Sequence, residues 1–198
     1  MRKNKIAGIV GGLISAVCGC TELDRNNSIE FGGGVRTISG RYLGYKVEQL
    51  PFSRVQVNHR LDEKTDVYRR FDYIQGELDA KRNILNGSVT GQFESGGIGI
   101  RHFPFSKYWG VEMGVEAFHA DYDMNGRLGQ VKMKIPDSAS GFGGTVGLIS
   151  AVPLDKKEKV FLEFSTGYNF GKSWAEKADV NFNGLYGTLG IRINLTGD

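Results

Sequence analysis

The stretch Trp109-Gly-Val-Glu-Met-Gly-Val-Glu-Ala117 alternates between two kinds of residue without a break. One face carries Trp109, Val111, Met113, Val115 and Ala117, and the other carries only glycine and glutamate. A period of two over this length predicts a β-strand with one apolar face. Glycine weakens strands and leaves backbone exposed, so a glycine/glutamate face suits a confined interior better than a wet surface. We therefore expect the apolar face to contact lipid and the other face to line a narrow transmembrane barrel.

Seven other segments complete the predicted barrel; five repeat this alternation, and the second and third have enough Tyr, Phe and Val for strands. They are residues 29–37, 45–57, 67–78, 91–103, 141–152, 160–170 and 185–195. The second and third lie in the least regular region. The alternative is that this region is one long surface loop, which would leave only six strands. Loops of that length are uncommon without a function. Short connections (residues 104–108 and 153–158) alternate with long ones (residues 121–140 and 171–183), as in outer-membrane barrels. The sequence thus predicts an all-β, eight-stranded, antiparallel up-and-down transmembrane β-barrel.

The N-terminus has the features of an export signal. Arg2, Lys3 and Lys5 precede an apolar run of 12 residues, from Ile6 to Val17. This run is too short to span a bilayer as a helix, which takes roughly 20 residues. No later apolar segment is long enough either, so a mature chain that crosses a membrane must do so as a barrel.

The segment Val17-Cys-Gly-Cys20 resembles the bacterial lipobox, in which a small residue precedes a cysteine that becomes lipidated. The resemblance implies a lipoprotein-type signal peptide over residues 1–19 and a lipid on Cys20. A tether over residues 20–27 and a barrel domain over residues 28–198 would follow. Lipidation at Cys18 is one alternative, and an ordinary signal peptide cut near Gly19 is another.

The basic excess of the chain lies in its first residues. The formal charge of +3 comes from 25 basic and 22 acidic residues, and three of the basic residues precede Cys20. From Cys20 onward the two signs balance, which argues against a nucleic-acid partner, since that would need a basic patch. No cysteine follows Cys20, so a chain cleaved there cannot form an intrachain disulfide.

Two stretches carry a resemblance to a known family. They are residues 96–118 (GGIGIRHFPFSKYWGVEMGVEAF), two alternating segments around a short turn, and residues 186–195 (YGTLGIRINL), an alternating final segment. With these, residues 28–195 resemble the OmpA-like small outer-membrane β-barrels. The resemblance implies a location in the outer membrane of a Gram-negative cell envelope.

Charged residues on the predicted inward faces form the candidate site. An eight-stranded barrel is just wide enough for side chains to fill it. Buried charges must pair there, because an uncompensated one costs several kcal/mol. We expect ion pairs that plug the lumen, with one glutamate left for water or for a basic residue such as Arg70; a switchable gate in a small pore is the alternative. The predicted network consists of Glu30, Arg36, Arg101, Glu112, Glu116, Glu163 and Arg192.

The sequence predicts no enzyme, no cofactor and no metal site. Glu112 and Glu116 are a pair suited to acid/base catalysis, but a plugged lumen admits no substrate. His119 and Asp121 lie near the outer end of their strand, where some barrel enzymes place catalytic groups, yet no serine completes a Ser-His-acid set at a convincing spacing. A lipid A-modifying barrel enzyme is therefore the third interpretation.

The first interpretation is a small outer-membrane barrel, with a lipid anchor, in a structural or surface-interaction role. Its partners would be outer-membrane lipids and an extracellular or host-surface molecule that contacts the long loops 123–140 and 171–184. The second interpretation is a lipid-anchored, soluble lipocalin-like barrel whose apolar faces turn inward around a small apolar ligand. Against it, residues 29–37 lack the tryptophan of the Gly-x-Trp signature, and the glycines would lie bare on the surface.

Overall fold

The computed structural model describes residues 27–40, 48–82, 85–128, 131–174, 180–181 and 183–195, and strands make up most of them. The strands are β1 (Asn27–Gly40), β2 (Glu48–Arg60), β3 (Thr65–Arg82), β4 (Leu85–Ser106), β5 (Trp109–Leu128), β6 (Val131–Pro153), β7 (Val160–Trp174), the two-residue β8 (Val180–Asn181) and β9 (Gly184–Asn194). Among these residues no helix is long and apolar enough to cross a membrane.

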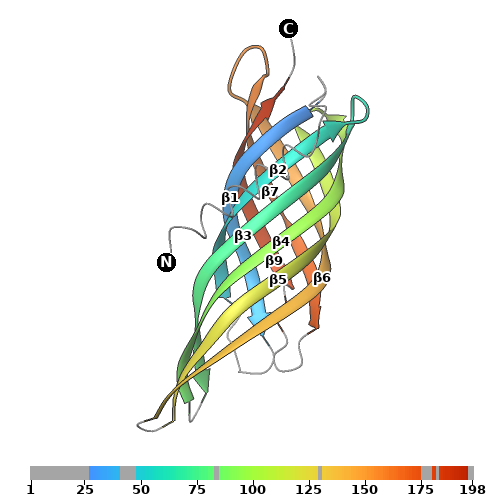
Figure 1. Ribbon diagram of the computed structural model, residues 1–198. Helices are drawn as coiled ribbons and strands as arrows, with labels where there is room; N and C mark the ends of the chain where they lie inside the picture. Colours follow the sequence, from blue (N-terminus) through green and yellow to red (C-terminus); the bar gives the residue numbers. More distant parts are fainter. Residues whose placement is uncertain are drawn as a thin grey trace.

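The eight long strands form a closed antiparallel barrel (Figure 1). Neighbours along the chain pair with one another from β1 to β7, then β7 pairs with β9 and β9 with β1. The short β8 adds two further pairs to the end of β1. The predicted fold class, an eight-stranded up-and-down barrel, is confirmed.

The irregular region between residues 40 and 86 supplies two wall strands, so the alternative of one long surface loop is wrong. Pro51 had obscured β2 because proline cannot donate a ladder hydrogen bond. In the barrel, Pro51 lies opposite Val35 on β1, while pairing of β2 with β3 starts only at Phe52. Proline therefore occupies a position where the strand has a partner on one side alone, which sheets tolerate.

Residues 121–140 were predicted to be a long polar loop, and this prediction is wrong. β5 and β6 stay paired as far as Leu128 and Val131, and β3 and β4 as far as Arg82 and Leu85. Pairing of β3 with β2 ends at Ile74, and β6 meets β7 only from Ser140. The ends of β3, β4, β5 and β6 therefore form a four-stranded sheet that projects beyond the barrel wall, at the lower left of Figure 1.

Short turns lie at the other end of the barrel, uppermost in Figure 1. Residues 61–64 join β2 to β3, Lys107 and Tyr108 join β4 to β5, and residues 154–159 join β6 to β7. In outer-membrane barrels short turns face the periplasm. We call this the short-turn end, and the opposite one the extended end.

The wall presents its apolar side chains outward, as predicted. Met113 and Val115 are 58% and 63% exposed on the outer face of β5, while Glu112 before them and Glu116 after them are 0% and 2% exposed. The inward glycines make room for rings in the lumen: a Cβ on Gly99 or on Gly114 would collide with the Tyr68 hydroxyl. The glycine/glutamate face of the sequence is therefore the face of a crowded interior.

Candidate functional site: the lumen and the outer wall

Arg101, on β4, is the centre of the first cluster of buried charges in the lumen. Its Nη1 lies 3.0 Å from Glu30 Oε2 and 2.7 Å from Glu163 Oε1. Its Nε lies 3.3 Å from Glu112 Oε2. Arg192 adds a second cation, with Nη1 3.2 Å from Glu163 Oε2. Five strands thus bring three carboxylates and two guanidinium groups together on the barrel axis, nearer the short-turn end.

A second cluster lies nearer the extended end of the lumen. Asp72 accepts hydrogen bonds from Arg54 Nε at 2.7 Å and Nη2 at 2.9 Å, a bidentate pair. Glu116 is ion-paired with Arg36, and its Oε2 lies 3.0 Å from Arg70 Nη2. Arg36 also reaches Asp72, at 3.8 Å. This cluster holds three guanidinium groups and two carboxylates.

The two clusters compensate each other. The first carries one more carboxylate than arginines and the second one more arginine than carboxylates, so the ten residues are formally neutral together. The aromatic rings of Tyr68 and Tyr186 connect them, and further polar groups bind the first cluster. The Tyr186 hydroxyl donates to Glu112 Oε1 at 2.5 Å, and the Gln56 amide oxygen, turned toward Arg101, accepts from its Nη2 at 2.8 Å. The centroid of the Tyr68 ring lies 5.5 Å from the guanidinium carbon of Arg101 and 5.7 Å from that of Arg70.

Apolar side chains flank the charged clusters toward both ends of the lumen. At the short-turn end, the Phe161 ring lies 4.6 Å from the Arg192 guanidinium and the Phe103 ring 6.0 Å from it. At the extended end the buried apolar residues are Leu50, Phe52, Ile74, Phe93, Phe118, Ala120 and Ala139. Ion pairs between apolar layers are shielded from water, which strengthens their attraction.

All seven residues named from the sequence lie in the lumen, in one cluster or the other. Arg54 and Asp72 were missed as members, although they make the best-formed pair. Both lie on strands whose outward faces alternate poorly. The usable signal was on the inward face instead, where Arg54, Gln56 and Asn58 follow one another at a period of two.

Comparison with known proteins identifies the fold but not a relative in sequence. No protein-family model and no curated protein matches the chain. The attachment invasion locus protein Ail of Yersinia pestis, solved with the heparin analogue sucrose octasulfate, is 14% identical with a TM-score of 0.55, over 84% of this chain and 97% of that one. The outer-membrane protein OprG of Pseudomonas aeruginosa is 10% identical with a TM-score of 0.54, over 85% and 95%.

The fold is that of a small outer-membrane β-barrel. At these identities the likeness carries no information on ligand or activity. The wall adds its own argument, because a continuous apolar outer surface of this extent needs lipid around it. The chain therefore lies in the cell outer membrane, as predicted. The soluble lipocalin-like alternative required apolar faces around a central ligand, and the lumen instead holds the charged clusters.

Three sequence-based assignments fall wholly or largely outside the described residues. They are the signal peptide (residues 1–19), the lipid on Cys20 and the tether to the barrel, of which only Asn27 is described. The predicted contact loop 171–184 is wrong in part, because residues 171–174 belong to β7, residues 180–181 to β8 and Gly184 to β9.

A polar set lies on the outer wall toward the extended end. His119 Nδ1 lies 2.8 Å from Ser140 Oγ on the neighbouring strand, and His119 Nε2 lies 3.3 Å from Asp121 Oδ1. No spacing in the sequence indicated Ser140, because the register of β5 against β6 places it opposite His119. In the described part of the chain no three His, Cys, Asp or Glu residues form a metal-binding group.

At the short-turn end, a hydrogen-bonded set connects two turns. Lys107 Nζ donates to Glu158 Oε2 at 2.5 Å, and the Tyr108 hydroxyl donates to Glu158 Oε1 at 3.0 Å. The bond from Lys107, followed by the bond from Tyr108, lowers the pKa of the Glu158 carboxyl below its usual value. Because the folded pKa is the lower one, this link stabilises the fold above the usual carboxyl pKa and is lost as the pH falls through the lowered value.

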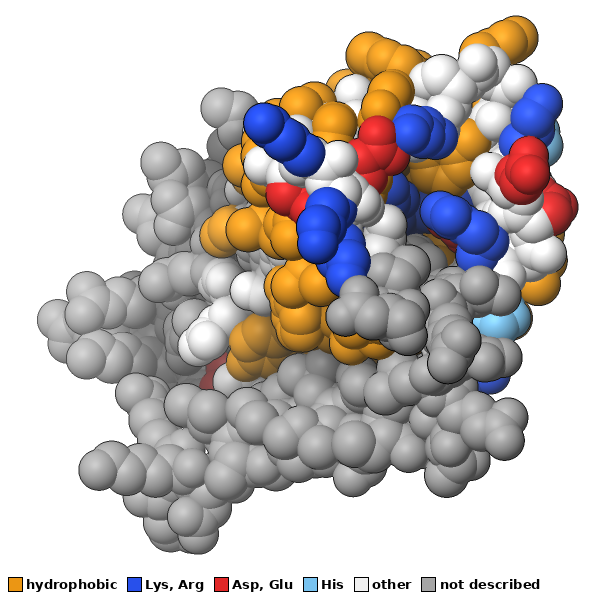
Figure 2. Space-filling view, turned by 90° about the horizontal axis from the view of Figure 1, so that it is seen from above, with side chains coloured by type: hydrophobic (Ala, Val, Ile, Leu, Met, Phe, Trp, Pro, Cys, Tyr) orange, Lys and Arg blue, Asp and Glu red, His pale blue; other side chains and the backbone are white. Residues whose placement is uncertain are grey.

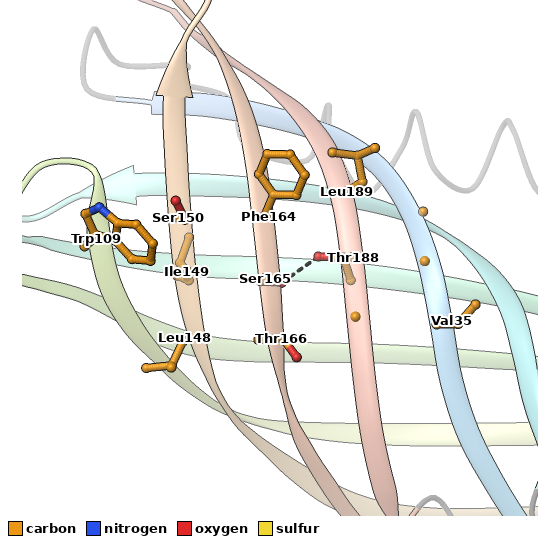
Figure 3. Close-up of a pocket in the computed structure, with 13 residues that line it drawn as sticks. Val35, Trp109, Leu148, Ile149, Ser150, Phe164, Ser165, Thr166, Thr188 and Leu189 are labelled. Carbon is orange, nitrogen blue, oxygen red and sulfur yellow. Dashed lines mark hydrogen bonds between the residues drawn. The ribbon is translucent and has the colours of Figure 1, made fainter.

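The outer wall is also hollowed on one side (Figure 3). A groove of about 560 Å³ crosses β6, β7, β9 and β1. Figure 3 shows Val35, Leu148, Phe164 and Leu189 around it, with Trp109 at one end. Its volume falls within the range of about 300–1,000 Å³ typical of small-molecule sites.

Proposed function

We propose that this protein is a closed outer-membrane barrel that presents an extracellular contact surface and carries out no catalysis. The observation that carries the proposal is the four-stranded sheet formed by the ends of β3, β4, β5 and β6 beyond the wall. A paired sheet is a more rigid platform for a partner than four separate loops. Its open edges, β3 after Ile74 and β6 before Ser140, also offer backbone groups for strand addition.

The lumen supports the closed state of the proposed barrel. Arg101 and Glu112 are fully buried, and Arg36 is 1% exposed. Opening a conducting path would require breaking several buried pairs at once, and breaking a single one costs about 3–5 kcal/mol. The proposed lumen is therefore a structural plug rather than a gate.

Shortening the projecting sheet tests the proposed contact surface. Asp121 and Ser138 lie opposite each other, so residues 122–137 are replaced by a two-residue Asn-Gly turn. We expect the shortened chain to form a heat-modifiable barrel, since every strand of the wall is intact, and to lose adhesion of expressing cells to host-cell layers. Immobilised heparin is the first defined ligand to try, because Ail was solved with a heparin analogue. Equal adhesion by the full and shortened chains would contradict the proposal.

The lipid anchor is part of the same proposal. β1 begins at Asn27, seven residues after Cys20, at the short-turn end of the barrel. A lipid on Cys20 could therefore sit in the inner leaflet while the barrel spans the membrane. Replacing Cys20 by Ser should abolish incorporation of labelled palmitate and leave the barrel in the membrane fraction.

The absence of catalysis rests on the exposure of the Ser140, His119 and Asp121 set. In a working triad the acid is buried and holds the histidine in one tautomer. Here the side chains of Asp121 and His119 are 73% and 51% exposed. We expect a fluorophosphonate probe to leave Ser140 unlabelled in membranes that contain the folded barrel. Labelling that disappears in Ser140→Ala but persists in Ser138→Ala would instead favour the third interpretation, a lipid A-modifying barrel enzyme.

A further inference from the structure

The groove on the outer wall has a small-residue floor and bulky sides. Gly187 and Thr166 lie on the floor, while Phe164, Leu189 and Val35 flank it with exposed fractions of 44%, 50% and 45%. All five belong to the outward faces of β7, β9 and β1. Such a shape holds an unbranched apolar chain, which a flat wall of side chains would contact on one side only.

The groove runs from the membrane interface into the apolar layer. Trp109, at its outer end, pairs with Ser150, three residues before β6 ends at Pro153. Val35, at its inner end, lies eight residues after β1 begins at Asn27. At about 3.3 Å per residue along a strand, the two ends therefore lie at different depths from the short-turn end. Tryptophan is enriched at the level of lipid headgroups, which fits the outer end of the groove.

Basic side chains lie beyond this outer end. Lys156 and Lys157 are exposed in the turn that follows β6. The two acidic residues of the same turn are already engaged: Asp155 Oδ1 accepts a hydrogen bond from the Val160 amide at 2.8 Å, and Glu158 accepts from Lys107. Figure 2, seen from the short-turn end, shows Lys and Arg side chains, with Asp and Glu side chains among them, beside hydrophobic ones. Counted with Lys107 and Lys159, four lysines outnumber these two carboxylates, so the turn and its neighbour offer positive charge to an anionic group.

We propose that the groove and the β6–β7 turn together bind one anionic phospholipid of the inner leaflet. One acyl chain lies in the groove, with its end near Val35, and the phosphate headgroup lies beside Lys156 and Lys157. Charge complementarity at the turn and the depth of the groove both favour this occupant. The inference rests on the outer-membrane location, and the experiment separates the two.

The chain offers a matched pair of variants for the test. A Cβ added to Gly187 or to Gly96 meets no atom within 4 Å, and both glycines face outward. Gly187→Phe fills the groove, whereas Gly96→Phe adds the same ring to the wall on β4, away from it. Trp109 is the reporter, since the sequence has only two tryptophans and Trp174→Phe removes the other.

The Trp174→Phe barrel is placed in phosphatidylcholine vesicles that contain rising fractions of brominated lipid, which quenches Trp109 on contact. Brominated phosphatidylglycerol should reach half-maximal quenching at a lower fraction than brominated phosphatidylcholine. The difference should be on the order of fivefold per lysine. Gly187→Phe should abolish this preference, Gly96→Phe should keep it, and Lys156→Ala with Lys157→Ala should remove it without any change in the wall.

Equal quenching curves for the two brominated lipids would overturn the inference, because they would indicate ordinary lipid contact. So would equal curves for Gly187→Phe and Gly96→Phe. If the turn variants alone lose the preference while Gly187→Phe keeps it, the groove has no part in binding and the proposal also fails. If the barrel did not lie in a membrane at all, neither brominated lipid would quench Trp109. That result is distinguishable from the equal but non-zero quenching expected for ordinary lipid contact.

Discussion

Replacing Arg101 by Met is expected to prevent most of the chain from reaching the folded barrel. Arg101 holds Glu30, Glu112 and Glu163, and its loss leaves these three carboxylates with Arg192 as the nearest remaining cation of their cluster. Removing one partner of a buried pair costs about 3–5 kcal/mol, and here three pairs lose the same partner. The free energy of unfolding of a typical domain is only about 5–15 kcal/mol.

The measurement is the free energy of unfolding in urea with lipid vesicles, together with heat-modifiable migration. Arg60→Met is the matched control, because Arg60 Nε lies 3.5 Å from Asp66 and its side chain is 50% exposed. That change should cost clearly less than Arg101→Met, because Arg60 holds one carboxylate through one long contact and is half exposed, although the Asp66 side chain is only 6% exposed. A second variant, Arg101→Met with Glu163→Gln, should recover part of the loss by removing one unpaired carboxylate. Losses of equal size for Arg101→Met and Arg60→Met would show that the lumen is wet and that its ion pairs are weak.

Placing an arginine on the lipid-facing side of β5 should have the second-largest effect. Met113 is 58% exposed in the middle of the apolar stretch that predicted the fold. Met113→Arg should destabilise the barrel by about 2–4 kcal/mol, the cost of arginine near the bilayer midplane, with the smaller cost of about 0–1 kcal/mol expected near the interface.

The matched control for this prediction is Gln92→Arg. Gln92 is exposed on β4 and lies opposite Asp121, beyond the apolar part of the wall. Urea unfolding in vesicles measures both variants. If arginine were tolerated equally at residues 113 and 92, the outer face of β5 would not be in lipid.

The wall of the barrel could be predicted from the sequence because alternation is a local property. Val111, Met113 and Val115 report which residues share a face whatever the partner strand is. The direction of that face followed from the glycines between them, which only a crowded interior explains. β2 was harder to predict, since Pro51 interrupts its outward pattern where the strand has one neighbour.

The composition of the lumen clusters could not be derived in the same way. Which guanidinium meets which carboxylate depends on register and barrel stagger, and one residue of slip turns every side chain to the other face. Arg54 meets Asp72 only because β2 and β3 align these two residues. The same holds for His119 and Ser140, which are brought together by the long β5–β6 hairpin. That hairpin was mistaken for a loop because residues 121–140 are rich in polar residues, although Val131, Met133 and Ile135 alternate within it.

Photolabelling from the lipid phase tests the orientation of the wall most directly, because it needs no substitution. The unmodified barrel in vesicles is irradiated with a phospholipid that carries a diazirine on its acyl chain, and adducts are located by mass spectrometry. Adducts should fall on Val111, Met113, Val115 and Ile191, which point outward, and should spare Tyr68, Ile149 and Tyr186, which are buried in the lumen. Adducts on Tyr68, Ile149 and Tyr186 with none on the outward set would contradict the account.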